Sequence, residues 1–346
     1  MRLMSVAKLG RVGRAKRVAC CLALLLAACG GGTQVEKFVP NRMLVFGDET
    51  SVIDDTGFTA NGRKYTVNGF GTDGVTRDCR VNGVWIQYLA GRWGIVFPQC
   101  NPNALATTSR IYAANGAKVG DLAAQIAAAG AMGNKDLTTV MVGINDIVDL
   151  YAQYPASSEA ALKTQAESRA TALAAQIRRI TETGAKVVFV TIPELGISPF
   201  SQSENTAHPR EDRAAVLSRL SAAFNARLRT AVSTSSSPSF IDGHQGVQVL
   251  GDELFRAIAA TAGVSGSAYL NASVGICDAA KAPNVIDCNN STDPAVNTLI
   301  TATSTPALVA GGTPSNYLWA DATHLSPGAH GSLGTTAANR TNTNPL

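Results

Sequence analysis

The sequence predicts one α/β domain with three layers, a doubly wound parallel sheet between two layers of helices. Strand-like apolar runs alternate with long amphipathic segments, a pattern typical of parallel sheets covered by helices. Residues 185–192 (AKVVFVTI) are continuously apolar and rich in β-branched residues, as expected of a strand buried on both faces. The length of 346 residues lies within the range of one large domain of this kind.

Four apolar runs are the predicted strands. The first, residues 42–46 (RMLVF), ends at Gly47, and the second is residues 139–143 (TVMVG). The third is the run at 185–192, and a fourth is predicted at 239–242 (SFID). We expect functional side chains just after these strands, because open α/β sheets bind ligands at the carboxyl ends of their strands.

Helical spacing or composition marks five further segments. The segment 157–183 is rich in Ala, Leu and Glu, and Gly184 suits the left-handed position that often follows a helix. The predicted helices cover residues 84–90, 121–129, 157–183, 211–232 and 329–340. Two polar segments are predicted to be irregular: 52–80, an elaborated loop, and 262–316, a long surface excursion.

Composition and charge narrow the function classes. Hydrophobic residues make up 45% of the chain and charged residues only 16%, so a large core is expected and a coiled coil is excluded. The net charge of +4 arises from residues 1–28, which hold six basic residues and no acid; the rest has 23 basic and 25 acidic residues. A nucleic-acid partner is therefore not expected.

The N-terminal segment resembles a bacterial lipoprotein signal. Residues 1–17 are basic, and residues 18–28 form an apolar run too short for a membrane-spanning helix. The run leads into the box LAAC at 26–29, and the resemblance implies cleavage before Cys29 and lipidation of its thiol. An ordinary secretory signal with an incidental cysteine is the alternative.

These boundaries predict the domain organisation and the location. The predicted parts are a signal peptide at 1–28, a flexible leash at 29–40, the folded domain at 41–340 and a tail at 341–346. We expect a monomer in the bacterial cell envelope, held to the membrane by the lipid on Cys29, or a secreted protein.

The cysteines support export. Four lie beyond the signal region: Cys79, Cys100, Cys277 and Cys288. Their even number and pairwise closeness favour two local disulfides, 79–100 and 277–288, in an oxidising compartment, although four cysteines allow three pairings. A zinc site is disfavoured because no C-x-x-C spacing occurs and the four histidines lie far from the pairs, so no metal is expected.

Two polar motifs suggest chemistry. Asp321 precedes His324 by three residues, and an acid so placed in a tight turn can accept the Nδ1–H of the imidazole and leave Nε2 to act as a base. Asn145 follows the second strand. In a parallel sheet, Asn145 therefore lies at the edge where catalytic groups gather.

The ordered set of motifs resembles the SGNH, or GDSL, hydrolases over residues 41–340. The motifs are Phe46-Gly47-Asp48, Asn82-Gly83-Val84-Trp85, Asn115-Gly116-Ala117, Gly143-Ile144-Asn145-Asp146, Ile192-Pro193-Glu194-Leu195-Gly196 and Asp321-Ala322-Thr323-His324. The resemblance implies a flavodoxin-like sheet and an esterase or lipase that needs no cofactor. Its ordered series is far more specific than any single motif.

The resemblance also implies a role for each matching residue. Gly116 would offer its backbone N–H and Asn145 its side-chain amide to an oxyanion hole, with the backbone N–H of residue 49 as the third donor. His324 would be the general base, oriented by Asp321, and Asp48 would brace the turn after the first strand.

The nucleophile position departs from the family, because Glu49 stands where the family has serine. Three interpretations follow. Glu49 itself attacks the ester or activates water, although it would also pair with His324 and hold that ring protonated. Alternatively, Thr50 or Ser51 supplies the hydroxyl, although two residues along a helix is a rotation of about 200° and turns Ser51 away. In the third interpretation the site binds a ligand without cleaving it.

The expected function is hydrolysis of acyl or acetyl esters carried by a small molecule, a lipid or a glycan. A catalytically silent relative that holds an ester- or glycan-bearing ligand is the alternative. Two further side chains receive interpretations: Trp319 as part of the substrate cleft, and His330 as a residue that seats the last helix.

Overall fold

The computed structural model of the chain describes residues 38–234, 240, 242–301 and 307–343. The predicted signal peptide, Cys29 and most of the predicted leash lie outside these residues. Among the helices of the described ranges, none combines the length and the apolar character needed to cross a membrane.

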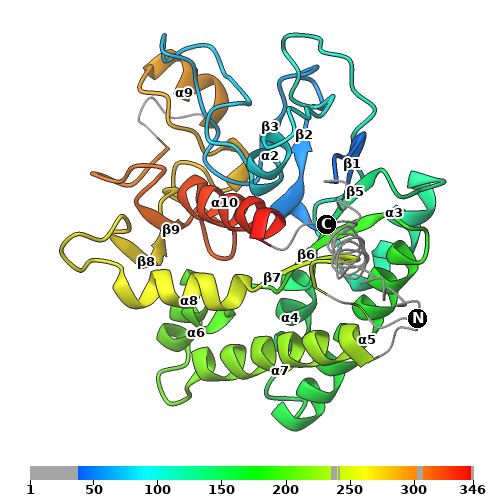
Figure 1. Cartoon of the computed structure of the whole chain (residues 1–346). Coiled ribbons are helices and arrows are strands. Elements are labelled where there is room, and N and C mark those ends of the chain that lie inside the picture. Colours follow the sequence, from blue (N-terminus) through cyan, green and yellow to red (C-terminus); the bar gives the residue numbers. More distant parts are fainter. Residues whose placement is uncertain (1–37, 235–239, 241, 302–306, 344–346) are drawn as a thin grey trace, which may run out of the picture. The chain divides into compact units, whose positions relative to one another are not determined.

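A five-stranded parallel sheet is the centre of the domain (Figure 1). Its strands are β1 (Arg42–Gly47), β4 (Arg110–Ile111), β5 (Asp136–Met141), β6 (Lys186–Val190) and β7 (Gly246–Val249). Their order is β4-β1-β5-β6-β7, and every neighbouring pair is parallel. This is the flavodoxin-like order, whose switch point lies between β1 and β5. The predicted fold class is confirmed.

Helices cover both faces of the sheet. The helices of the described ranges are α2 (Trp85–Gly91), α3 (Leu122–Ala129), α4 (Ile144–Tyr151), α5 (Glu159–Thr181), α6 (Pro199–Ala207), α7 (Arg213–Thr234), α8 (Gly251–Thr261), α9 (Pro294–Thr301) and α10 (Pro327–Thr343). The short 3-10 helices are η1 (Glu49–Ser51), η2 (Val119–Asp121), η3 (Leu195–Ile197) and η4 (Val285–Asp287). Helix α2 packs on α10, and α5 packs on α7.

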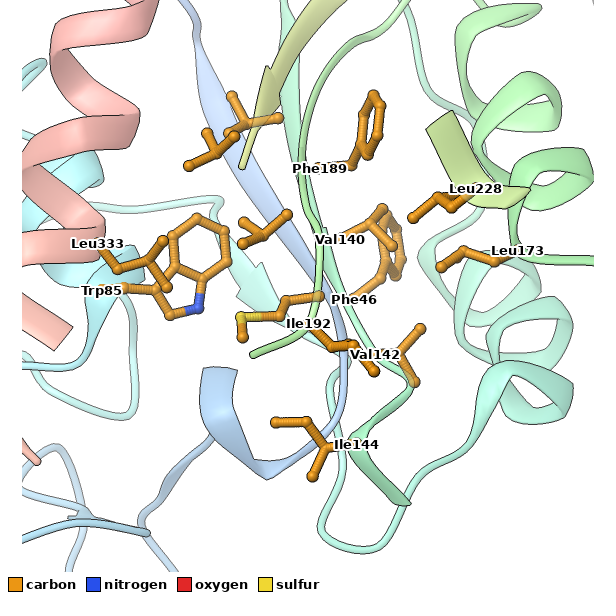
Figure 2. Close-up of a cluster of buried hydrophobic side chains, with 14 of the residues drawn as sticks. Phe46, Trp85, Val140, Val142, Ile144, Leu173, Phe189, Ile192, Leu228 and Leu333 are labelled. Carbon is orange, nitrogen blue, oxygen red and sulfur yellow. The ribbon is translucent and has the colours of Figure 1, made fainter. Parts of the chain in front are cut away.

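The core lies on both sides of the strands. Figure 2 shows Trp85 of α2 and Leu333 of α10 on one side, and Leu173 of α5 and Leu228 of α7 on the other. All four side chains are fully or almost fully buried. Helix α5 illustrates why the sequence folds this way: its buried residues recur every three or four positions, so they form one apolar stripe.

Residues 239 and 241 of the predicted strand at 239–242 lie outside the described residues, and β7 provides the last strand of the sheet a few residues later. Gly246 lies opposite Val187 in the register, and a Cβ at Gly246 would approach the Val187 carbonyl oxygen to 1.9 Å. Glycine is therefore required in this strand, and it interrupts the apolar run by which strands are recognised. Strand β4 and helices α4, α6 and α8 are also absent from the sequence-based prediction.

Residues 262–316, expected on the surface, carry elements of their own. They contribute β8 (Asn271–Gly275), which pairs with β9 (Tyr317–Trp319), together with η4 and α9. Several of their residues form a second, smaller apolar cluster with Val67. The loop before α2 contains an antiparallel pair, β2 (Ile53–Asp54) and β3 (Arg63–Lys64).

Both predicted disulfides are confirmed. Cys79 is bonded to Cys100, and Cys277 to Cys288. The first disulfide closes the segment that carries α2, and the second closes the segment that carries η4.

Candidate active site

Three neighbouring strands bring Glu49, Gly116 and Asn145 together. Glu49 is the first residue of η1, directly after β1; Asn145 lies in the first turn of α4, after β5; and Gly116 follows β4. Because β1 lies between β4 and β5, the three residues meet at the carboxyl edge of the sheet, next to the switch point.

Two glycines allow the turns that aim these residues. Gly47 has φ of 132°, and a Cβ there would lie 1.9 Å from the Met141 carbonyl oxygen. Gly143 has φ of 131°, and a Cβ there would lie 2.7 Å from the ring of Phe224. Only glycine fits such positions, because it combines a positive φ with the absence of a side chain.

The carboxylate of Glu49 occupies the predicted oxyanion-binding position. Its Oε2 accepts hydrogen bonds from the backbone N–H of Gly116 (2.8 Å) and from Nδ2 of Asn145 (2.9 Å). Its Oε1 lies 3.1 Å from the same amide nitrogen. The Glu49 side chain is only 6% exposed, so water replaces few of these contacts.

His324 and Asp321 complete the cluster from the turn that precedes α10. The Nδ1 of His324 lies 2.8 Å from both carboxylate oxygens of Asp321, and Oδ1 of Asp321 also accepts the backbone N–H of His324 (2.9 Å). On the other side of the ring, Nε2 of His324 is 3.6 Å from Oε1 of Glu49. The structure thus places all five predicted site residues in one cluster, which we call the Glu49 cluster: Glu49, Gly116, Asn145, Asp321 and His324.

The two acids keep the imidazole protonated. Burial alone would lower the pKa of His324, but the contacts with Asp321 and Glu49 raise it to about 10. Burial alone would raise the pKa of Glu49, yet His324, the backbone N–H of Glu49 itself and Asn145 bring it below its usual value. At neutral pH the pair is therefore a carboxylate and an imidazolium ion.

The pKa of Asp48 shifts in the opposite direction from that of Glu49. It is fully buried, and its Oδ1 accepts the backbone N–H of Thr50 (3.1 Å), which caps η1. Burial and then the charge of Glu49 raise the pKa of Asp48 well above its usual value. An Asp48 that braces the turn agrees with the role that the family resemblance implies.

Glutamate at position 49 has the shape of an acylated serine. Beyond Cβ, an acetyl ester of serine consists of an oxygen, a carbonyl carbon, a carbonyl oxygen and a methyl group. Glutamate has a methylene, a carboxyl carbon and two oxygens in the same connectivity. Oε2 of Glu49 therefore lies on the donors Gly116 and Asn145 as the carbonyl oxygen of an acyl-enzyme would.

The hydroxyl of Ser51 does not enter the cluster. Ser51 is fully buried, and its Oγ accepts a hydrogen bond from Nε1 of Trp85 (3.0 Å). This contact agrees with the predicted rotation of residue 51 away from the site. Ser51 therefore serves the packing of α2 against η1.

The other two interpreted side chains have different outcomes. Trp319 does not line a cleft: it is fully buried, and its Nε1 donates to the Ala272 carbonyl (3.0 Å). That interpretation is wrong, because β9 turns this ring into the core. His330 is buried on α10, its Nδ1 accepts the backbone N–H of Trp85 (3.3 Å), and burial lowers its pKa to about 3. It joins α10 to α2.

Sequence reasoning missed Tyr65. Its ring stacks on that of His324, with centroids 6.0 Å apart and planes inclined by 24°. Tyr65 follows β3 in a loop that carries no recognisable motif, so no sequence signal marks it. In the described ranges, no group of three or more His, Cys, Asp or Glu side chains is arranged to hold a metal ion.

The flavodoxin-like sheet gathers the polar residues of the Glu49 cluster at its switch point, where open α/β folds bind ligands. A family model described as GDSL-like Lipase/Acylhydrolase matches residues 44–330. The chain therefore belongs to this family, which comprises ester hydrolases. No curated protein matches the chain.

Two solved structures illustrate the similarity. A catalytic mutant of Axe2, an acetylxylan esterase from Geobacillus stearothermophilus, is 13% identical, with a TM-score of 0.44 over 88% of this chain and 94% of that one. A protein described as a GDSL-like lipase, from Parabacteroides merdae, is 12% identical, with a TM-score of 0.46 over 88% and 97% of the two chains. Family membership follows from the family model and not from these two structures.

Proposed function

We propose that the protein hydrolyses carboxylic esters of acyl or acetyl groups, with the Glu49 carboxylate in place of the family's serine hydroxyl. One observation carries the proposal: this carboxylate contacts two of the three predicted oxyanion donors, Gly116 and Asn145, and forms an ion pair with His324. The groups on which the family's chemistry depends, other than the serine, therefore surround one charged side chain.

The protonation states assign the roles. An imidazolium with a pKa of about 10 does not accept a proton at neutral pH, but it can donate one. The ionised Glu49 is the group that can accept one. We therefore assign Glu49 as the general base and His324 as the general acid, while Asp321 holds the ring through Nδ1.

The proposed cycle conserves protons. An entering ester carbonyl displaces the Glu49 carboxylate from Gly116 and Asn145, which then stabilise the developing oxyanion. Glu49 takes a proton from water as the water oxygen bonds to the carbonyl carbon. The bond to the alcohol oxygen then breaks, and His324 protonates the leaving alkoxide. Glu49 finally returns its proton to His324, and the acid and alcohol leave.

Slow turnover is expected from this arrangement. The carboxylate must first give up its hydrogen bonds to Gly116 and Asn145, and its lowered pKa makes it a weak base. Ligand holding without turnover is the second candidate function. It is favoured by the same occupancy, since Glu49 already fills the position of an acyl carbonyl.

Hydrolysis of p-nitrophenyl acetate by wild type, E49Q, H324A and E49S tests the proposal. Glutamine keeps the shape of residue 49 and removes its charge, so E49Q should lose the wild-type activity. H324A should lose activity most clearly toward ethyl acetate, because an ethoxide leaving group needs the proton of His324 and p-nitrophenolate does not. E253Q is the matched control, because the Glu253 side chain is an exposed acid of α8 that pairs with Arg229. Activity that appears only in E49S favours ligand holding, and inertness of every variant contradicts the hydrolase.

Trapping with hydroxylamine separates a base from a nucleophile. If Glu49 attacked the ester, a mixed anhydride would form on its carboxylate, and hydroxylamine added during turnover would convert it to a hydroxamate at residue 49. If Glu49 acts as a base, no covalent intermediate forms and residue 49 keeps its mass. Mass spectrometry of the peptide that contains residue 49 distinguishes the two outcomes.

We also propose export and lipid anchoring through Cys29, with envelope or extracellular esters of lipids or glycans as substrates. The basic segment, the LAAC box and the two disulfides support this proposal. Metabolic labelling with a palmitate analogue should mark wild type but not C29S. We expect the protein to be a monomer, and light scattering should give the mass of one chain.

A further inference from the structure

A cavity of about 460 Å³ lies outside the Glu49 cluster. Its volume falls within the range of about 300–1,000 Å³ that is typical of small-molecule sites. Most of its wall is apolar: Phe58, Phe70, Val75, Val296 and Ile300. The wall joins the loop before α2 to α9, and no residue of the Glu49 cluster contributes to it.

The charged residues of the wall are two arginines and one aspartate, so one arginine has no acid partner within the wall. Arg63, Arg77 and Asp287 line this cavity, which we call the arginine pocket. Arg63 is paired with Asp287 at 2.7 Å. For Arg77, no carboxylate partner is found among the residues that the structure describes, and its buried Nε has no hydrogen-bond partner there.

Within the described part of the chain, an aromatic ring and not an acid holds Arg77 in place. Its guanidinium group lies 3.6 Å from the centroid of the Phe58 ring, a cation–π contact that fixes its position beside the apolar wall. Burial and then the charge of Arg63 lower the pKa of Arg77, as expected of a cation without an acid nearby. Phe58 and Val75 are 36% and 50% exposed, so the pocket is open to solvent.

We propose that the arginine pocket binds a medium-chain fatty acid, with the carboxylate on Arg77 and the chain along the apolar wall. Arginine pairs with carboxylates through two parallel hydrogen bonds, and the pocket offers one unneutralised guanidinium beside apolar side chains. The identity of the ligand as a reaction product rests on the proposed function, since ester hydrolysis releases such an acid. Arg63 of the pocket is two residues from Tyr65, whose ring stacks on that of His324 in the Glu49 cluster.

Calorimetric titration with dodecanoate tests the proposal. Wild type should bind it with one site, and R77Q should weaken binding about tenfold or more, the effect of losing a charge-assisted pair. R92Q is the matched control: Arg92 also stacks on an aromatic ring, that of Trp93, and does not line the pocket. Acetate and the neutral amphiphile decyl maltoside should bind at least tenfold more weakly than dodecanoate.

A second variant guards against misfolding of R77Q. V75D places a carboxylate on an exposed wall position beside Arg77 and should abolish dodecanoate binding, while V264D, at a similarly exposed valine outside the pocket, should not. Equal affinity of R77Q and wild type overturns the proposal. So does binding of phosphatidylglycerol vesicles without binding of free dodecanoate, since the pocket would then hold a lipid headgroup.

The test of dodecanoate binding does not require the protein to hydrolyse esters. R77Q and V75D should hydrolyse p-nitrophenyl acetate at the wild-type rate. Loss of dodecanoate binding with unchanged hydrolysis supports the pocket, and an inert enzyme that still binds dodecanoate through Arg77 overturns the proposed function but not the pocket.

Discussion

The Glu49 cluster and the arginine pocket differ in whether the protein itself supplies partners for a charged side chain. In the cluster, the carboxylate of Glu49 finds two hydrogen-bond donors and an imidazolium within the protein itself. In the pocket, Arg77 has an aromatic ring beneath it and no acid partner among the described residues. A ligand of the Glu49 cluster must first displace the protein groups that already bind the Glu49 carboxylate. A ligand of the arginine pocket can instead supply the acid partner that Arg77 lacks among the described residues.

The largest effect is expected from E49S. Serine restores the hydroxyl, empties the oxyanion position and releases His324 from its ion pair with residue 49, so the rate of p-nitrophenyl acetate hydrolysis should rise roughly 10³-fold or more. Steady-state kinetics measures the change. An E49S rate equal to that of wild type would show that occupancy by Glu49 is not what limits the cluster.

N145A tests the shared donor. Asn145 holds the Glu49 carboxylate now and the oxyanion during reaction, so its removal in the E49S background should lower kcat about 10²-fold. N339A, at an exposed position of α10, should leave kcat unchanged and is the control. A rise in KM with an unchanged kcat would place Asn145 in substrate binding and not in oxyanion stabilisation.

The pH profiles of wild type and E49S should diverge above neutrality. Wild type uses protonated His324, so its activity should persist until the pH passes about 10 and then fall roughly tenfold per pH unit. In E49S the neutral ring is the base, so activity should rise with pH through a lower pKa. Two profiles that rise together with pH would contradict the assignment of His324 as an acid.

The same shift predicts a stability change of the opposite sense to that of an acid whose pKa is lowered by folding. The pKa of His324 is higher folded than unfolded, so its stabilising contribution is complete below about pH 6.5, the unfolded value. It is lost as the pH rises to about 10. Urea denaturation of wild type should therefore lose more stability over this interval than that of H324A, and equal losses would contradict the shift.

The smallest effect on catalysis should come from the second disulfide. C277S/C288S frees the segment next to Asp287, so it should weaken dodecanoate binding several-fold and lower the free energy of unfolding by about 2–4 kcal/mol. Hydrolysis should change less than twofold. A comparable loss of dodecanoate binding and of ester hydrolysis would mean that the two sites are not independent.

Strong periodicity made much of the fold predictable. The strands near residues 42 and 186 and the helices α5, α7 and α10 were predicted because a buried strand or an apolar stripe leaves a continuous sequence signal. Strand β7 was misplaced because close approach of the backbone of Val187 demands Gly246. Strand β4 has only two residues, too few for any pattern.

The two sites differ in how far sequence could predict them. The residues of the Glu49 cluster follow strands or stand in a short local motif, so order along the chain indicated their meeting. The arginine pocket joins Phe58 and Arg77 to Asp287 and Ile300, more than 200 residues apart in sequence. No local pattern encodes such a contact, which depends on how the segment with the second disulfide packs on the loop before α2.

Nuclear magnetic resonance of His324 tests the central claim most directly. With ¹⁵N-labelled histidine, assigned through H324A, the ring should remain doubly protonated in wild type until the pH approaches 10 and should lose its proton at lower pH in E49Q. A wild-type ring that titrates near the ordinary value of about 6.5 would contradict the ion pair between Glu49 and His324.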